Sequence, residues 1–561
     1  MEQSRRDLLF ADKQVEGSIV GAMKAYTKEP QANDGTHRYG NIRVKPKTSG
    51  PYASNTEIEI PITSDNFTIT EFENSYLHLI CRVSFNVSNL PDISGTDDFS
   101  NMLRNNQYVF VGLKCSNHVI RNYHFLFHDI PITSTRQPNA LYESFLYSNF
   151  KAKGEIANKK WVFSPYDEVS MMDNSTCGMY IPLSELVNGT SKQLDIIIPI
   201  KELLAMEGFD EYPNKIFGEL KFAFNTTYEG FVYTEVNPVE SIRKAIIRGD
   251  ISATNSNLHL SDILAIDYKT IPYHHAFEQQ GIPSQVSFIT GYDTTNGLTY
   301  STVSDFKITM SDIETTDIWM DIRGYEANTE AIQALREHFA SNPFTVCAQR
   351  VERYSFHSGA DASQLSTDVN IRMRRVTDVE ILMPTNSLQR TVFHNPALTN
   401  FQLLIGSIRY PDQLVSTTSP EFFQQQLQNT DFDSFFEAND SYEHSLTDCR
   451  TSSDGYRNPT TDDTSFVPIF SLERANAGEL VFDGRDDVEV KVEITGRPLY
   501  PQYNIYPLEA SGVTPPPILC CCTDCYWLFR IVDGVPICQY VTEYSYEEAY
   551  NNPSLQAVRA I

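Results

Sequence analysis

The densest group of chemically reactive side chains is a set of cysteines near the end of the chain: Cys520, Cys521, Cys522, Cys525 and Cys538. Thiolates bind zinc, form disulfides, act as redox pairs and accept acyl chains. A structural zinc site uses two spaced pairs of ligands, and only one Cys-x-x-Cys pair is present here. The bulky residues at 526–529 favour a buried or interface segment. Free buried thiols are therefore the first interpretation, with subunit cross-links, a metal site and a lipid attachment left open.

Two histidine pairs are the next candidates for metal binding. His124 and His128 are four residues apart, a spacing that binds zinc on a helix. Their surroundings predict a strand, on which the two side chains would lie about 13 Å apart and could not share a metal. On a helix, Glu278 would come within reach of the pair His274 and His275, but a further metal ligand is missing nearby. We expect a loop or a strand at that pair.

Acidic clusters and catalytic motifs give no stronger candidate for a metal-binding or catalytic site. The segment Asp483-Gly484-Arg485-Asp486-Asp487 lacks the alternate-ligand spacing of a calcium loop, and a turn between strands is expected there. The sequence has no Gly-x-Ser-x-Gly elbow, no phosphate loop, no His-Glu-x-x-His and no dinucleotide fingerprint. We therefore assign no catalytic, cofactor-binding or metal-binding residue, and we expect a protein that is not an enzyme and holds no cofactor.

Length and composition narrow the class of protein. The chain has 561 residues, 41% of them hydrophobic and 12% aromatic, which is enough for two or more cores rich in strands. A formal net charge of −28 argues against extensive direct contact with nucleic acid. We expect no secretory signal and no membrane span, because no apolar run approaches about 20 residues. Unpaired cysteines indicate a reducing compartment, such as the cytoplasm or the nucleus.

Alternating hydrophobic residues predict an all-β protein with two tandem sandwiches. The alternation is clear at 77–87 and 220–225, and cleanest at 488–495. Helices are expected at 328–340 and, after the cap Ser419-Pro420, at 419–429. The expected organisation is an N-terminal arm at 1–55 with a possible helix at 7–26, a first jelly roll at 56–240, a linker at 241–257, a second jelly roll with inserted loops at 258–500, and a cysteine-containing C-terminal arm at 501–561.

Several segments resemble one family of viral shell proteins. They are Asn74-Ser75-Tyr76-Leu77-His78-Leu79, the run Asn122-Tyr123-His124-Phe125-Leu126-Phe127-His128-Asp129-Ile130-Pro131-Ile132, the segment 142–146, the segment 394–411, the run 466–474 and the strand that leads into Gly496-Arg497-Pro498. In style and layout they are similar to the double jelly-roll major capsid proteins of Polinton/Maverick elements, virophages and adenovirus-like viruses. The resemblance covers about a third of the chain. The cysteine-rich tail has no place in the family pattern, which leaves open whether residues 500–561 belong to the second roll or form an added arm.

The resemblance implies a structural role in a virion. Such a chain would form a homotrimer, a pseudo-hexagonal block of six rolls, and the blocks would assemble an icosahedral shell around a DNA genome. Partners would be copies of the chain itself, a penton protein and minor capsid proteins, with assembly in the host cytoplasm or nucleus. The basic residues of the N-terminal arm could face the genome or an acidic neighbour, and a solvated arm explains them equally well: Arg5, Arg6, Lys13, Lys24, Arg43, Lys45 and Lys47.

Three other functions stay open at this point. An extracellular glycan-binding β-sandwich protein would need a signal peptide, disulfides and exposed aromatic platforms. A β-sandwich hydrolase would need a carboxylate or Ser-His site. A capsid protein with a single roll and very long insertions would differ only in the number of rolls.

Overall fold

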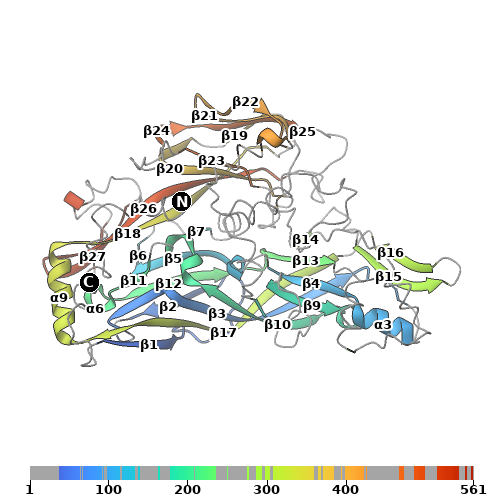
Figure 1. Cartoon of the computed structure of the whole chain (residues 1–561), viewed down its shortest axis with the longest axis horizontal. Coiled ribbons are helices and arrows are strands. Elements are labelled where there is room, and N and C mark those ends of the chain that lie inside the picture. The colour runs from blue at the N-terminus through green and yellow to red at the C-terminus, as the bar shows by residue number, and fades with distance from the viewer. Residues whose placement is uncertain are drawn as a thin grey trace.

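A computed structural model of the chain describes, with short gaps inside several ranges, residues 37–138, 162–163, 177–235, 275–276, 286–425, 467–498, 515–541 and 550–559. The fold is all-β, and strands are stacked into a lower and an upper lobe (Figure 1). The longer helices are α3 (Asp98–Asn106) and α9 (Thr329–Ser341). Within the described ranges, no helix is long and apolar enough to cross a membrane.

The lower lobe is a sandwich of two layers around one core. One layer is the sheet β1–β17–β3–β10–β8, and the other consists of the sheets β2–β12–β5–β6 and β14–β13–β4–β9. Its strands are β1 (His37–Val44), β2 (Glu57–Ile62), β3 (Ile69–Ser88), β4 (Tyr108–Leu113), β5 (Ile120–Phe127), β6 (Ile130–Pro131), β8 (Val162–Phe163), β9 (Cys177–Pro182), β10 (Thr190–Pro199), β12 (Leu220–Thr226), β13 (Phe231–Glu235), β14 (His275–Ala276) and β17 (Lys307–Ala327).

Strand order identifies this sandwich as a jelly roll. A jelly roll has strands B to I in chain order, arranged as B–I–D–G in one sheet and C–H–E–F in the other. Here β2 takes position B, β12 and β13 take I, β4 and β5 take D, and β9 takes G, with the matching pairings. The other layer has β3 as C, β10 as H and β8 as E. Position F falls outside the described residues.

Positions D and I are each divided into two strands at the same level. The 3-10 turn η2 (Ser116–Val119) separates β4 from β5, and residues 227–230 separate β12 from β13. The two interruptions touch, since the Thr227 amide donates to the Val119 carbonyl at 2.8 Å. A Cβ on Gly230 would lie 2.5 Å from the carbonyl oxygen of His118, so this close approach requires glycine.

The upper lobe has all eight strands of a second jelly roll. Its sheets are β18–β26–β20–β23 in the order B–I–D–G and β19–β25–β21–β22 in the order C–H–E–F. The strands are β18 (Phe344–Ser355), β19 (Gln364–Ser366), β20 (Ile371–Leu382), β21 (Leu398–Ile405), β22 (Ile408–Val415), β23 (Ile469–Ser471), β25 (Val492–Pro498) and β26 (Ile518–Val532). The expectation of two tandem jelly rolls is confirmed.

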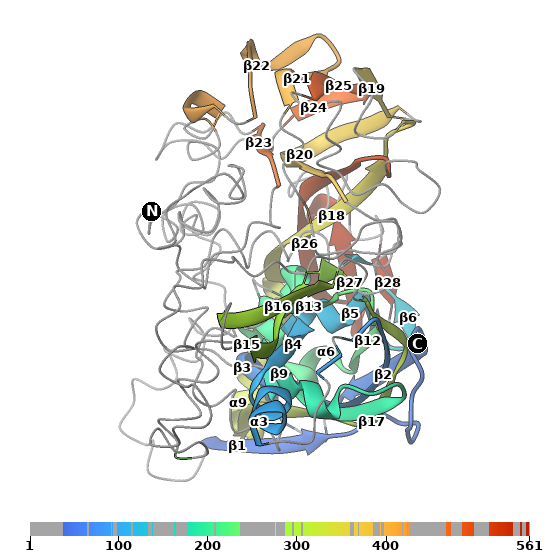
Figure 2. The ribbon, with the colours of Figure 1, turned by 90° about the vertical axis from the view of Figure 1, so that its right-hand side faces the viewer.

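The two rolls share their longest strands. The start of β18 at Phe344 and the end of β26 at Trp527 lie in the core of the first roll, whereas Val351 and Cys521 on the same strands lie in the core of the second. Figure 2 shows β18 and β26 running from the upper lobe down into the lower one. The strand β27 (Val535–Val541) continues from β26 and pairs with it and with β28 (Ala557–Arg559). One ladder therefore connects both cores.

This pairing corrects the expected C-terminal arm. We expected residues 501–561 to form an arm, but β26 is the central strand of the second roll, between β18 and β20. The reason is physical: the consecutive residues Cys520, Cys521 and Cys522 are all buried, so both faces of the strand are covered here, which is typical of a central strand. The second roll therefore reaches residue 532 instead of ending near 500.

The expected start of the second roll at 258 is also wrong, as is the arm at 37–44. The strand β17 pairs with β3 along most of its length and so extends the first roll, together with the hairpin β15 (Val286–Asp293) and β16 (Gly297–Val303) before it in the chain. The second roll begins with β18. At the other end of the chain, β1 pairs with β17 and forms the edge of the same sheet. The possible helix at 7–26 and the linker at 241–257 lie outside the described residues, apart from a turn position at 249.

Both predicted helices begin where their caps indicate. The side chain of Asn328 accepts a hydrogen bond from the Ala331 amide at 2.8 Å, and α9 follows it. The Ser419 hydroxyl accepts from the Phe422 amide at 3.2 Å, and residues 420–422 are helical. Phe339 of α9 is buried against Phe217 and Phe344, which closes one end of the first core.

Candidate functional site

The most elaborate group of polar side chains lies on one sheet face of the first roll. Alternation along β3 and β17 sends Leu77, Leu79, Ile318 and Met320 into the core. The residues between them point the opposite way, because side chains on a strand alternate between the two faces. We call this side the outer face, defined by Arg43 and Lys45 near β1, His78 and Arg82 on β3, and Glu314, Asp317, Trp319 and Asp321 on β17.

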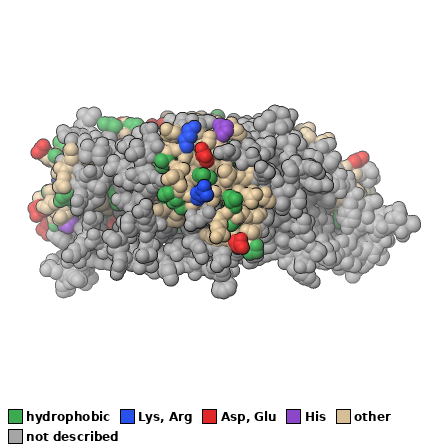
Figure 3. All heavy atoms as spheres, turned by 90° about the horizontal axis from the view of Figure 1, so that it is seen from above, with side chains coloured by type: hydrophobic (Ala, Val, Ile, Leu, Met, Phe, Trp, Pro, Cys, Tyr) green, Lys and Arg blue, Asp and Glu red, His purple; other side chains and the backbone are tan. Residues whose placement is uncertain are grey.

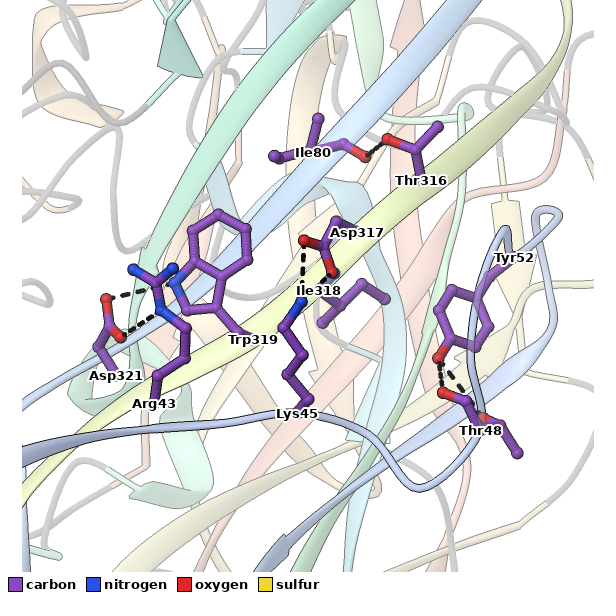
Figure 4. A network of polar contacts seen from close by, with 10 residues as sticks. All are labelled: Arg43, Lys45, Thr48, Tyr52, Ile80, Thr316, Asp317, Ile318, Trp319 and Asp321. Atoms are coloured by element: carbon purple, nitrogen blue, oxygen red, sulfur yellow. Dashed lines mark hydrogen bonds and ion pairs between the residues drawn. The ribbon is translucent and has the colours of Figure 1, made fainter.

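Four of these side chains form one connected cluster around the indole of Trp319 (Figure 4 shows all but His78). The imidazole of His78 stacks on the indole, with 5.0 Å between ring centroids and an interplanar angle of 11°. The guanidinium carbon of Arg43 lies 4.3 Å from the indole centroid. Asp321 holds the cluster together by accepting hydrogen bonds from Arg43 Nε at 3.2 Å and from Trp319 Nε1 at 3.3 Å.

The register of the paired strands brings these side chains together. Arg43 is the cross-strand partner of Asp321 in the β1–β17 pair, and Trp319 is the partner of His78 in the β17–β3 pair. Opposite residues on neighbouring strands have Cβ atoms about 5 Å apart, within reach for stacking and ion pairing. Three adjacent strands are thus needed to build the cluster, and residues from both ends of the first roll contribute to it.

Each described cation of the outer face has an anion beside it. Arg43 pairs with Asp321 at 3.2 Å, Lys45 with Asp317 at 3.0 Å, and Arg82 with Glu314 at 3.5 Å. These side chains are partly exposed, so the pairs add little to the stability of the fold. Their effect is to make this part of an acidic protein locally neutral.

The pKa of His78 is governed mainly by burial of the imidazole. Burial is the largest influence and lowers its pKa below 6.5; Asp321 raises the pKa and Arg43 lowers it further. Although His78 Nε2 is only 3.0 Å from Asp321, the carboxylate does not outweigh the loss of hydration. The polar groups of the cluster contact one another: Asp321 accepts hydrogen bonds from Arg43 and Trp319 and lies beside His78. This arrangement favours recognition of a surface over proton transfer to a substrate.

A second feature of the same sheet is a pair of carboxylates that face each other. Glu211, in β11 (Glu211–Tyr212), is directly opposite Glu71 of β3, whose other neighbour is Arg323 of β17. Burial is the main cause that raises the pKa of Glu211 to about 7, and the charges of Glu71 and Asp210 add to it. Like charges directly opposite each other destabilise a sheet, so this pair gains stability when Glu211 is protonated.

The cysteine run is buried in strand β26. The described cysteines Cys81, Cys520, Cys521, Cys522, Cys525 and Cys538 are buried free thiols. Burial raises the pKa of Cys520 and Cys538 well above the ordinary value for a thiol. The Cys525 thiol contacts the Tyr540 hydroxyl at 3.1 Å. The structure thus supports the interpretation of these residues as free buried thiols.

The described histidines of the two pairs are not part of a metal-binding group. His124 is on β5, buried, and 3.9 Å from Glu57, whereas His128 is in the turn after that strand and contacts the Phe217 carbonyl at 3.0 Å. The expectation that both lie on one strand is therefore wrong for His128. His275 is on β14, while His274 and Glu278 lie outside the described residues.

The acidic segment 483–487 and the basic arm are also only partly described. Residues 485–487 belong to β24 (Arg485–Val490), which pairs with β20, so these residues are in a strand and not in the expected turn. Arg43, Lys45 and Lys47 pair with Asp321, Asp317 and Glu219, whereas Arg5, Arg6, Lys13 and Lys24 lie outside the described ranges. In the described part of the chain, no group of three or more His, Cys, Asp or Glu is arranged to hold a metal ion.

Sequence reasoning missed the Trp319 cluster, although a signal was present. Tryptophan is rare in this chain, with three in 561 residues. Trp319 and Asp321 alternate with Ile318, Met320 and Ile322, so the pattern places a large aromatic residue on the solvent side of a predicted strand. An aromatic residue at such a position indicates a contact surface.

Comparison with known proteins gives structural neighbours only. No protein-family model matches the chain, and no curated protein matches its sequence. The major capsid protein of mavirus is 11% identical, with a TM-score of 0.43 and coverage of 94% of this chain and 96% of that one. A structure of the Sputnik virophage gives 10% identity, a TM-score of 0.42 and coverage of 94% and 95%. The capsid of the virus PBCV-1 is 7% identical, with a TM-score of 0.41 and coverage of 93% of this chain and 100% of that one.

The strand order carries the assignment without help from this distant likeness. Both halves have the jelly-roll arrangement, one with all eight positions and the other with every described position in place. The expected resemblance is thus confirmed at the level of the fold: the chain is a double jelly-roll protein.

Proposed function

We propose that the chain is a major capsid protein whose copies form trimers, and whose trimers tile an icosahedral shell around a DNA genome. The observation that carries the proposal is the duplicated strand order, with two rolls joined through the shared strands β18 and β26. Two rolls per chain give six rolls per trimer, a block with nearly hexagonal outline that suits a closed lattice.

The filled interior of both rolls supports a structural role. Jelly rolls that bind small molecules keep an open cavity between their sheets. Here the space is occupied by packed side chains, including the fully buried Phe125, Phe222 and Trp527 in the first core and Phe401 in the second. Such rolls offer their outer faces and loops for binding. Function then depends on surfaces that meet other molecules, and no bond chemistry is needed.

The alternatives fit less well. A single roll with long insertions is inconsistent with two separate sets of jelly-roll strand positions, one in each half of the chain. A glycan-binding protein would use an open aromatic ring as a platform, but the indole of Trp319 is contacted by His78 from one neighbouring strand and by Arg43 from the other. We therefore favour self-assembly over glycan binding.

The remaining parts of the proposal follow from the shell itself. The protein would be located in the virion after synthesis in the host cytoplasm or assembly in the nucleus, and a penton protein and minor capsid proteins would complete the shell. With a net charge of −28, the chain would leave charge neutralisation of the genome to other cations.

The test is expression of the full chain, followed by negative-stain electron microscopy and binding to an array of glycans. Closed shells or sheets of hexagonal blocks are expected, with no glycan bound. A chain that stays dispersed as single molecules and binds a defined glycan would contradict the proposal.

A further inference from the structure

We propose that the first roll closes itself with a covalent isopeptide bond between the amine of Lys221 on β12 and the carboxyl group of Asp129 in the turn between β5 and β6. The bond is a modification that the chain makes once on itself, so it goes beyond the proposed shell and does not depend on it. The observation that carries the proposal is a buried lysine that contacts one carboxylate while a second carboxylate lies beside the same amine.

Lys221 is an unusual lysine because it is buried. Lysine and arginine side chains ordinarily reach water, as those at the upper end of the molecule do in Figure 3. Lys221 is only 2% exposed, and every residue of β12 is buried. Its ladder neighbours are Pro61 of β2 and Leu126 of β5, and Leu126 is in turn opposite Pro131 of β6. Opposite residues share a face of the sheet, so apolar groups flank the lysine on both sides.

The surroundings of the amine favour its uncharged form. Burial is the largest cause that lowers the pKa of Lys221, and the neighbouring ammonium group of Lys47 lowers it further, while Glu59 acts in the opposite direction. Only an uncharged amine has the lone pair that attacks a carbonyl carbon. A desolvated lysine next to a second cation is a recognised form of activated nucleophile.

The turn that carries Asp129 is fixed against β12. The His128 amide donates to the Glu219 carbonyl at 3.2 Å, and the His128 ring contacts the Phe217 carbonyl at 3.0 Å. His128 and Asp129 have φ values of 48° and 66°, which suit a two-residue turn between paired strands. The Asp129 carboxylate thereby contacts the Lys221 amine. Reacting groups held in place in this way behave as if present at about 10⁵–10⁸ M, which favours condensation over hydrolysis.

Glu219 provides a group that can move protons. Its Oε1 atom lies 3.8 Å from Lys221 Nζ and 3.9 Å from Lys47 Nζ. This oxygen is buried, and among the described residues it accepts no hydrogen bond. A carboxylate placed beside a reacting amine can take a proton from it and pass the proton on. The cluster therefore contains a nucleophile, an electrophile and a proton relay.

The reaction is a condensation that needs no oxidant, reductant or cofactor. A proton first passes from the Lys221 ammonium to the Asp129 carboxylate, which leaves a free amine and a carboxylic acid. The nitrogen then attacks Cγ of Asp129, and a C–N bond forms. Glu219 takes a proton from the nitrogen and returns it to the departing hydroxyl, so that the C–O bond breaks and one water leaves. The Asp129 side chain is 71% exposed, so this water is released directly to solvent.

The bond would change how the first roll unfolds. It would join the β5–β6 turn to β12 and close a loop from residue 129 to residue 221, which includes β8, β9 and β10. A covalent cross-link stabilises a fold mainly by restricting the unfolded chain, as a disulfide does. The first roll would gain such a link without an oxidising compartment, in a chain whose described cysteines are free thiols.

The experiment measures the mass of the denatured full-length chain and then maps its tryptic peptides. We expect a mass about 18 Da below that of the sequence, which corresponds to one water, and a branched peptide that joins Asp129 to Lys221. A chain of full mass whose two peptides separate would overturn the proposal. Loss of water at any other place, including a succinimide within Asp129 itself, would also overturn it.

Three variants test the role of each group. Lys221→Arg keeps the positive charge without the nucleophilic amine and should have its full mass. Glu219→Gln should form the bond roughly 100-fold more slowly, measured on chains isolated at intervals after synthesis. Lys192→Arg is the matched control, because Lys192 contacts Glu185 in the same roll but is partly exposed, and this variant should lose water as the unmodified chain does. Bond formation at the unmodified rate in Glu219→Gln would overturn the assignment of Glu219 as the relay.

The mass of the unmodified chain gives an answer that does not depend on how a variant folds. It also separates this proposal from the capsid function. A chain of full mass that still forms shells would overturn the bond and leave the capsid function intact. A cross-linked chain that never associates would support the bond and contradict the capsid function.

Discussion

The indole of Trp527, on a strand of the second roll, packs edge-on against the ring of Phe209 from the first roll, with 5.3 Å between the ring centroids. Trp527 also contacts Phe125 at 5.8 Å and Tyr540 at 4.9 Å. Aromatic pairs in this geometry add to the free energy gained by burying the rings. The two rolls are therefore joined by a shared aromatic core and not by a flexible linker.

Replacing Trp527 with alanine should destabilise both rolls together. The side chain is fully buried, so we expect Trp527→Ala to lower the free energy of unfolding by about 3–5 kcal/mol. Urea unfolding followed by circular dichroism measures the change. Trp319→Ala is the control, because it removes the same side chain from a sheet surface and should cost about 1 kcal/mol. Equal effects of the two substitutions would contradict the shared core.

The carboxylate pair on the first roll predicts a pH dependence of stability. The pKa of Glu211 is raised to about 7 in the folded chain, above its ordinary value of 4.5. The folded state then binds more protons than the unfolded state between these values, so stability falls as the pH rises from about 4.5 to 7. After allowing for solvent screening, we expect Glu211→Gln to raise stability at pH 8 by about 1–2 kcal/mol and to flatten this slope. Thermal unfolding of both proteins across the pH range tests this prediction. The same dependence of stability on pH in Glu211→Gln and the unmodified chain would contradict it.

The protonation of His78 should respond in opposite directions to its two charged neighbours. Asp321 raises the pKa of His78 and Arg43 lowers it, while burial keeps it below 6.5. Asp321→Asn should lower the pKa further, and Arg43→Met should raise it. Titration of the imidazole by NMR distinguishes the two. Shifts of the same sign would show that the cluster does not have the geometry described.

The buried thiols should be inert until the protein unfolds. Burial raises the pKa of the Cys81 thiol to about 12 and that of Cys520 well above its usual range, so neither forms the reactive thiolate at pH 8. An alkylating reagent followed by peptide mass spectrometry should label the described cysteines only in denaturant. Val187→Cys supplies an exposed thiol as the positive control. Rapid native labelling of Cys520 would place β26 outside the core.

Local patterns in the sequence predicted strands well but not their partners. Alternation at 77–87 correctly indicated β3, yet β17, which pairs with it, lies more than 200 residues further along the chain. No local signal reports such a distant pairing. For this reason the expected start of the second roll at 258 is wrong: it places β17 in the second roll, whereas β17 pairs with β3 of the first.

The cleanest predicted strand, 488–495, shows a second limit. The structure divides it at Lys491: β24 pairs with β20 in one sheet, and β25 pairs with β21 in the other. Alternation has the same period before and after a corner, so it cannot show where a chain passes between sheets. The Trp319 cluster escaped prediction similarly, since it needs three strands whose residues are far apart in sequence.

The proposed function requires self-association of this double jelly-roll chain, and the molar mass of the purified protein tests this directly. Light scattering after size exclusion should give a species of about 190 kDa, three times the 63.8 kDa of one chain, that persists on dilution. A single species of 63.8 kDa at every concentration would contradict the account.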